Sequence, residues 1–197
     1  MKRNNRINCK VVAAALCIVM VMGFSGCDIF GVRKSMGVMY DRLTNFNKAM
    51  NKLDYEAARS VTDWTEEDGD YTAIEALFDT SYYGNTEGEG FVECTEYIAS
   101  TIKIIFDITA AKIDDDQATL DVKYEMVDWQ SVYAKSHGSY DELLEDLKNC
   151  PDKITIESSI VFENVDKEKD WRLCIINDLG NIMSFVHTLP EISGQEQ

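Results

Sequence analysis

A change in the period of the hydrophobic residues near residue 101 constrains this fold more than any other feature of the sequence. Before it, apolar residues recur every three or four positions, as on one face of a helix; they are Met39, Leu43, Phe46, Met50, Leu53, Ala57 and Val61. After it, apolar residues alternate with polar ones, as in strands with one buried face; the clearest set is Ala118, Leu120, Val122, Tyr124 and Met126. The sequence therefore predicts an α+β domain in which N-terminal helices pack on one face of a curved antiparallel sheet.

The helical half divides into several segments. Asp54 stands where it can cap a second helix, so the long pattern predicts two helices with a bend between them. A third short helix is expected over residues 71–78 and another over 91–100. The stretch 84–90, which contains three glycines, is expected to be a flexible break.

The second half predicts two hairpins. The first joins a strand with Ile104, Phe106, Ile108 and Ala110 on one face to the strand over 118–126, through an acidic turn at 114–117. The second joins the strand over 154–163 to a strand in which Trp171, Leu173 and Ile175 share a face. Between the hairpins, Ser139 is expected to cap a helix over 140–149.

The first 26 residues are expected to be an export signal and no part of the fold. Residues 1–10 carry four basic side chains and no acidic one, and an unbroken run of twelve apolar residues, 11–22, follows. Twelve helical residues extend about 18 Å, which is short of the roughly 30 Å hydrocarbon core of a bilayer. A basic segment, a short apolar segment and then small residues are typical of a signal peptide.

The residues after the apolar run, Phe24-Ser25-Gly26-Cys27, resemble the lipobox of bacterial lipoproteins. The resemblance implies cleavage after Gly26, a diacylglyceryl thioether on Cys27, and N-acylation, for example with palmitate, in some bacteria. It implies a protein anchored by lipid to the extracytoplasmic face of the cell membrane. The alternatives are an uncleaved signal anchor that reaches Phe30, and ordinary secretion by a general signal peptidase.

Removal of the signal peptide makes the chain more acidic. The whole chain has 19 basic and 35 acidic residues, a net charge of −16. The four basic residues leave with the signal peptide, so the remaining 171 residues keep 15 basic against 35 acidic ones, a net charge of −20. This charge excludes nucleic acid as a partner, and it leaves the acyl chains on Cys27 as the contact with the bilayer. We expect a tether over 27–37, one domain over 38–189 and a polar tail over 190–197.

Three cysteines remain besides Cys27. Export permits a disulfide, and Cys94 with Cys150 is the pair to test; three reduced thiols are the alternative. Cys174 lies inside an apolar strand pattern and is expected to be a small buried hydrophobe. The sequence contains no C-x-x-C and no Cys/His cluster with zinc spacing, so it predicts neither a metal site nor a cofactor.

The order of elements resembles the nuclear transport factor 2-like fold, a cone-shaped α+β family that includes ketosteroid isomerase-like proteins. The residues that carry the resemblance are the helix–turn–helix over 47–58, the paired strands over 106–124 and the last hairpin over 160–176. The segment 106–124 is similar to strands in extracellular, lipoprotein and transpeptidase-associated members of the family. The resemblance implies a curved sheet that can enclose a cavity.

Enzymes of that fold place an acid and a base on the inward face of the sheet. Here Tyr124 and Asp128 fall on the apolar side of their strand, so they are the polar residues that such a cavity would contain. The alternative is that Tyr124 belongs to the core and Asp128 is solvated at the strand end. Of the two histidines, His137 is expected in a surface loop, and His187 is expected to pack beside Phe185 and Val186.

No catalytic arrangement appears in the sequence, since it contains neither a Ser-His-Asp arrangement nor a glycine-rich phosphate loop. We therefore expect a non-catalytic domain that binds an envelope protein, a peptide or a small ligand. The alternatives are an isomerase- or hydrolase-like enzyme that uses a cavity of the sheet, and an accessory module in cell-envelope assembly.

Overall fold

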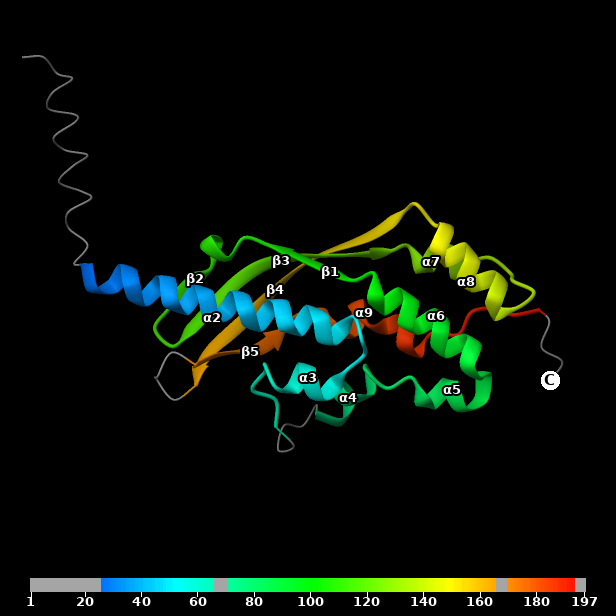
Figure 1. The fold of residues 1–197 in the computed structure, drawn as a ribbon, viewed down its shortest axis with the longest axis horizontal. Helices are drawn as coiled ribbons and strands as arrows, with labels where there is room; N and C mark the ends of the chain where they lie inside the picture. Colours follow the sequence, from blue (N-terminus) through cyan, green and yellow to red (C-terminus); the bar gives the residue numbers. More distant parts are fainter. Residues whose placement is uncertain (1–25, 66–70, 166–169, 194–197) are drawn as a thin grey trace, which may run out of the picture. The chain divides into compact units, whose positions relative to one another are not determined.

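The computed structural model of the chain describes residues 26–65, 71–165 and 170–193 (Figure 1). The chain divides into two units, Met1–Ser35 and Met36–Gln197, and the second contains the sheet and the hydrophobic core. The described part of this unit is an α+β domain with helices and an open antiparallel sheet, which confirms the predicted fold class.

The first helix, α2, spans Gly26–Met50 and includes the segment 27–37 for which we expected a tether. The predicted bend comes directly after it: Leu53 has a positive φ of 52°, and α3 then spans Tyr55–Arg59. Asp54 caps α3 as predicted, because its Oδ1 accepts a hydrogen bond of 2.9 Å from the N–H of Ala57. The cap satisfies one of the free amide groups at the start of the helix.

The next helices are α4 (Tyr71–Ala76), α5 (Ser81–Glu87) and α6 (Glu89–Ser100). The flexible break predicted over 84–90 is wrong, because only Gly88 between α5 and α6 leaves the helical conformation, with a φ of +85°. The other glycines allow close packing. A Cβ on Gly84 would lie 2.8 Å from Val92, and one on Gly90 would lie 2.6 Å from Tyr140. Glycine is therefore required here for close approach rather than for mobility.

The described residues form a five-stranded sheet of β1 (Lys103–Phe106), β2 (Lys112–Asp114), β3 (Gln117–Val127), β4 (Lys153–Val165) and β5 (Asp170–Ile176). The strand order is β1-β3-β4-β5, and β2 continues the edge beside β3. All of these pairs are antiparallel, and the hairpin β4–β5 forms as predicted. The strand β3 pairs with β1 and also with β2, a short strand that the sequence did not predict.

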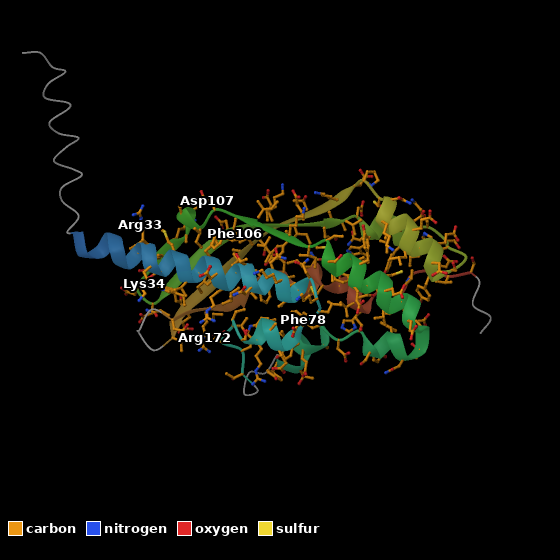
Figure 2. All side chains as sticks on the ribbon, viewed as in Figure 1. Arg33, Lys34, Phe78, Phe106, Asp107 and Arg172 are labelled. Atoms are coloured by element: carbon orange, nitrogen blue, oxygen red, sulfur yellow. The ribbon has the colours of Figure 1, made fainter. Side chains whose placement is uncertain are left out.

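The strand predicted over 104–110 is correct only as far as Phe106, where β1 ends (Figure 2). The Asp107 side chain accepts hydrogen bonds from the amide (3.0 Å) and hydroxyl (2.6 Å) of Thr109, and residues Ile108–Ala110 form a 3₁₀ turn. An aspartate that bonds its own local backbone offers the chain an alternative to the sheet ladder. The alternation of Ile108 and Ala110 with polar residues is therefore not that of a strand.

The helices cover one face of the sheet, and α2 from Met36 onward lies across the strands (Figure 1). The alternation in β3 is confirmed, because its inward residues are all buried; they are Ala118, Leu120, Val122, Tyr124 and Met126. Large side chains from α2, α6 and β4 fill the space against this face, including Phe46, Ile98 and Phe162. The opposite face of β3 is polar and faces solvent.

Two asparagines join α2 to the start of the sheet. Asn47 donates a hydrogen bond of 3.0 Å to the carbonyl of Ile102 and accepts one of 2.8 Å from the N–H of Ile104. Asn51 donates to the carbonyls of Ala99 (2.8 Å) and Ile102 (2.9 Å). These bonds satisfy the Ile102 carbonyl and the Ile104 N–H where the chain passes from α6 into β1. The Ala99 carbonyl also accepts a bond of 3.1 Å from the N–H of Ile102.

Between the hairpins lie α7 (Trp129–Tyr133) and α8 (Tyr140–Asn149). Ser139 caps α8 as predicted, with Leu143 and Leu147 buried beneath. After β5, α9 (Leu179–Ile182) and a 3₁₀ turn (Ser184–His187) bring Phe185 and Val186 into the core.

A bulge in β5 overturns the predicted facing of Ile175. Val161 pairs with Ile175 but Phe162 pairs with Leu173, so Cys174 is an extra residue in the strand. An extra residue reverses the facing of the residues after it in the strand. Ile175 is consequently 50% exposed and Ile176 is buried, while Cys174 is half-buried instead of being a core residue.

Candidate functional site

The lipobox-like residues lie at the border of the described chain. Ser25 and residues before it lie outside the described residues, as do the positively charged and apolar parts of the predicted signal peptide. Gly26 and Cys27 begin α2, and no side-chain geometry is described for them. In the part of the chain that the structure describes, none of the helices has the length and apolar character needed to span a bilayer.

Tyr124 and Asp128 do not form an acid–base pair. Tyr124 is fully buried in the core, and its hydroxyl has no hydrogen-bond partner among the described residues. Burial raises the pKa of this phenol, and the charge of Asp178 raises it further. Asp128 follows Tyr124 by four residues, and an extended chain of that length separates the two Cα atoms by about 13 Å. The Asp128 carboxylate caps α7, because it accepts a 3.1 Å hydrogen bond from the N–H of Ser131. The geometry agrees with the alternative in which Tyr124 is a core residue and Asp128 ends the strand.

Replacing Tyr124 by phenylalanine is expected to leave the free energy of unfolding unchanged or to raise it by about 1 kcal/mol, because the substitution removes a buried hydroxyl that lacks a protein partner. Denaturant unfolding followed by circular dichroism measures this change. A loss of more than about 1 kcal/mol would contradict the prediction, since it would mean that the hydroxyl makes a favourable bond in the folded protein.

The three cysteines described in the domain are free thiols with separate partners. Cys94 is buried in α6, and its thiol donates to the carbonyl of Tyr140 at 3.6 Å. Burial raises the pKa of this thiol to about 12. Cys150 comes directly after α8 and donates to the carbonyls of Asp128 (3.9 Å) and Asp152 (3.8 Å). The structure therefore shows no Cys94–Cys150 disulfide, and both thiols serve local packing.

The histidines occupy the reverse of the expected positions. His137 is only 2% exposed, its Nε2 lies 3.3 Å from a carboxylate oxygen of Asp146, and its backbone pairs with the segment around Ile192. The C-terminal segment covers this loop, which sequence alone could not show. His187 is exposed, and its Nε2 lies 2.8 Å from the carbonyl oxygen of Ala76.

A recess of about 260 Å³ lies where β3 ends and β4 begins. Its wall combines apolar surface from Tyr97 and Met126 with the charged side chains of Lys103, Glu125 and Lys153. Glu125 is only 23% exposed and pairs with Lys153 at 3.4 Å and Lys123 at 3.8 Å. Walls that combine apolar surface with a few charges suit a small ligand that carries both kinds of group.

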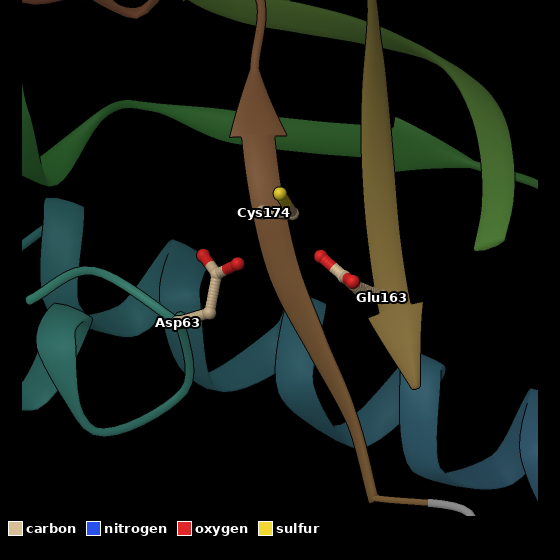
Figure 3. A group of neighbouring side chains, drawn as sticks. All are labelled: Asp63, Glu163 and Cys174. Atoms are coloured by element: carbon tan, nitrogen blue, oxygen red, sulfur yellow. The ribbon is translucent and has the colours of Figure 1, made fainter. Parts of the chain in front are cut away.

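A second group of functional side chains lies at the β5 edge of the sheet. A carboxylate oxygen of Asp63, a carboxylate oxygen of Glu163 and the sulfur of Cys174 all lie within 4.8 Å of one another, and all three residues are half-buried. Figure 3 shows the two carboxylates on either side of β5, directed toward the Cys174 thiol. We call these three residues the edge cluster. It combines the donor types that bind transition-metal ions.

Backbone pairing fixes the position of the edge cluster. The N–H of Asp63 donates 3.1 Å to the carbonyl of Leu173, and the N–H of Leu173 donates 3.2 Å to the carbonyl of Val61. The segment before Asp63 thus lies as a short parallel bridge along the free edge of β5. Burial raises the pKa of the Cys174 thiol to about 12, with further contributions from hydrogen bonding to Asp63 and from the charges of Asp63 and Glu163.

The edge cluster was not predicted from the sequence, because no local motif marks it. Its members come from a loop, from β4 and from β5, and Glu163 lies one hundred residues after Asp63. Spacing rules for metal sites rest on ligands that lie close together in sequence. The pairing of the segment at Asp63 with β5 and the pairing of β4 with β5 together bring the donors close to one another.

Comparison with models of known families, with curated proteins and with solved structures finds no match to this chain.

Proposed function

We propose that this chain is an extracytoplasmic lipoprotein, held at the cell membrane by lipid on Cys27, and that its α+β domain binds a ligand or partner without catalysing a reaction. The observation that carries the proposal is the sequence Ser25-Gly26-Cys27 directly after a basic segment and a short apolar run. The anchor needs acyl chains, because a domain with so many acidic residues is repelled by anionic lipid.

The packing of the domain supports binding rather than catalysis. The inward face of the sheet, which would line a catalytic cavity, is filled by side chains such as Leu120, Phe46 and Phe162. Tyr124 has no polar partner among the described residues of that core, and Asp128 is engaged in capping a helix. General acid–base catalysis needs a proton donor or acceptor within reach of a substrate, and this pair offers neither.

The finer fold assignment, a nuclear transport factor 2-like domain, belongs to the same proposal. It is supported by the order of elements, with helices before long antiparallel hairpins, and by the helices that cover one sheet face. In such a domain, whose interior is filled by side chains, we expect the ligand to bind on the outer surface. The recess beside Lys103, Glu125 and Lys153 is the surface that we propose for a small ligand or a segment of an envelope protein.

The anchor is tested by metabolic labelling with an alkyne fatty acid in a bacterial host. We expect the wild-type chain to carry the label and to partition into detergent, and the Cys27→Ala variant to lose both properties because no other residue provides the thioether. Cys150→Ala is the matched control and should keep the label, since Cys150 lies in the folded domain.

Globomycin provides an independent readout of the same step. Blocking lipoprotein signal peptidase should accumulate a lipidated precursor that still contains residues 1–26. A wild-type chain without label, or a label that persists in Cys27→Ala, would disprove lipid anchoring. A membrane-retained precursor that is insensitive to the drug would instead favour the uncleaved signal anchor.

A further inference from the structure

The edge cluster brings two carboxylates and a thiol within 4.8 Å of one another. Among the described residues, no lysine or arginine forms an ion pair with Asp63 or Glu163. Arg172 is directly opposite Glu163 in the β4–β5 register, yet its guanidinium binds Asp170, at 3.0 Å from both Nε and Nη2. Asp170 also binds Arg42 at 2.8 Å. The basic residue that pairs with Glu163 in the β4–β5 register is thus engaged with Asp170.

The bulge in β5 determines which side chain joins the two carboxylates. Regular alternation would place Ile175 inward, whereas the bulge makes Cys174 the unpaired residue and leaves it half-buried beside Glu163. Bulges commonly re-aim a side chain at functional sites. The bulge therefore accompanies the placement of the Cys174 sulfur within 4.8 Å of a carboxylate oxygen of Asp63 and one of Glu163.

We propose that Asp63, Glu163 and Cys174 bind a divalent cation of borderline softness, with Zn²⁺ as the best fit. Thiolate is a poor ligand for Ca²⁺ and Mg²⁺, which take oxygen donors, whereas Zn²⁺ binds sulfur and carboxylate oxygen together. Three protein ligands leave the fourth tetrahedral position to water or to a group from a partner. This inference does not depend on the lipid anchor.

The geometry needs only a small adjustment. Bonds of about 2.1 Å to oxygen and 2.3 Å to sulfur in a tetrahedron place the donors roughly 3.5 Å apart, and here they lie within 4.8 Å. Side-chain rotation about χ1 and χ2 supplies that contraction, since none of the three residues is fully buried. The hydrophobic core would not have to move.

Binding is balanced by the loss of one proton. The S–H bond of Cys174 breaks, the S–Zn bond forms, and the proton leaves to solvent. Two carboxylates and one thiolate then carry three negative charges against two positive charges of the ion. Because the ligand is the thiolate, metal binding at neutral pH displaces this proton, so affinity should increase with pH.

Solvent can reach the cluster. Cys174 lines a recess of about 410 Å³, together with Trp64, Ile175 and Asn177. The partial exposure of all three residues allows a water molecule to be the fourth ligand of an open zinc site. The net charge of the chain adds a long-range attraction for cations.

The test uses the purified full chain with Co²⁺ as a spectroscopic probe and Zn²⁺ as the competing ion. We expect one Co²⁺ per chain with a sulfur-to-metal charge-transfer absorption, displacement by Zn²⁺, and the release of about one proton per Zn²⁺ at neutral pH. Cys174→Ser should abolish the charge-transfer band, and Asp63→Asn and Glu163→Gln should each weaken Zn²⁺ binding about tenfold or more.

Cys150→Ser and Glu157→Gln are the matched controls, because they remove a thiol and a carboxylate outside the cluster. They should leave the band and the affinity unchanged, and circular dichroism establishes that every variant is folded. If Cys174→Ser fails to fold, the two isosteric carboxylate variants decide the matter. A wild-type chain that shows no saturable binding, or a band that survives Cys174→Ser, would overturn the proposal. Equal losses in the control variants would overturn it as well.

Discussion

Replacing Phe46 by alanine is expected to lower the free energy of unfolding by about 3–5 kcal/mol. Phe46 is completely buried in the cluster between α2 and the sheet, and its ring meets Trp64 edge-on, with the centroids 6.0 Å apart. Truncation removes apolar burial and leaves a cavity that the surrounding side chains fill only in part. Denaturant unfolding of the wild type and the variant measures the loss, with the same dependence of the free energy of unfolding on denaturant concentration fitted to both.

Tyr40 provides the control on the same helix. It is also aromatic but is 50% exposed, with a ring contact of 5.6 Å to Phe106. Tyr40→Ala should therefore cost about 1 kcal/mol or less. Similar losses at both positions would contradict a filled interior, and with it the argument that this domain has no catalytic cavity under the sheet.

Asn47→Ala is expected to lower the free energy of unfolding by about 2–3 kcal/mol. The substitution removes the acceptor for the N–H of Ile104 and one of the donors to the carbonyl of Ile102. A backbone group that is left unpaired away from water loses its full solvation, which costs more than an ordinary hydrogen bond gains. The loss should appear in thermal and denaturant unfolding.

Asn45 is the matched control, because it is the same residue type two positions away on α2 and its side chain is exposed. Asn45→Ala should change stability by no more than about 0.5 kcal/mol. Hydrogen exchange gives a local readout: the Ile104 amide should exchange faster in Asn47→Ala but not in Asn45→Ala. Unchanged protection of Ile104 in Asn47→Ala would show that the asparagine is not its principal partner.

The elements that the sequence predicted correctly are those held by local chemistry. The apolar period of α2, the cap by Asp54 and the alternation of β3 each depend on residues a few positions apart. Capping and periodicity act within one element, so they can be read before the fold is known.

The features that were predicted wrongly depend on neighbours distant in sequence. Gly84 and Gly90 indicated a flexible break, but they are needed where Val92 and Tyr140 approach the backbone. Ile175 was placed inward by alternation, and the register with β4 shifts at the bulge and turns it outward. His137 is buried because the C-terminal segment lies over its loop.

The candidate sites also divide into those that contiguous residues predict and those that depend on residues distant in sequence. By itself the sequence determined the α+β order of elements and the acidic charge, and it predicted the lipid anchor at Cys27, since each depends on composition or on contiguous residues. Only the tertiary structure decided that Tyr124 is a core residue and that Asp63, Glu163 and Cys174 meet at the sheet edge. The physical reason is that side-chain burial and donor convergence are set by strand register and by pairing across one hundred residues, and no local pattern encodes that pairing.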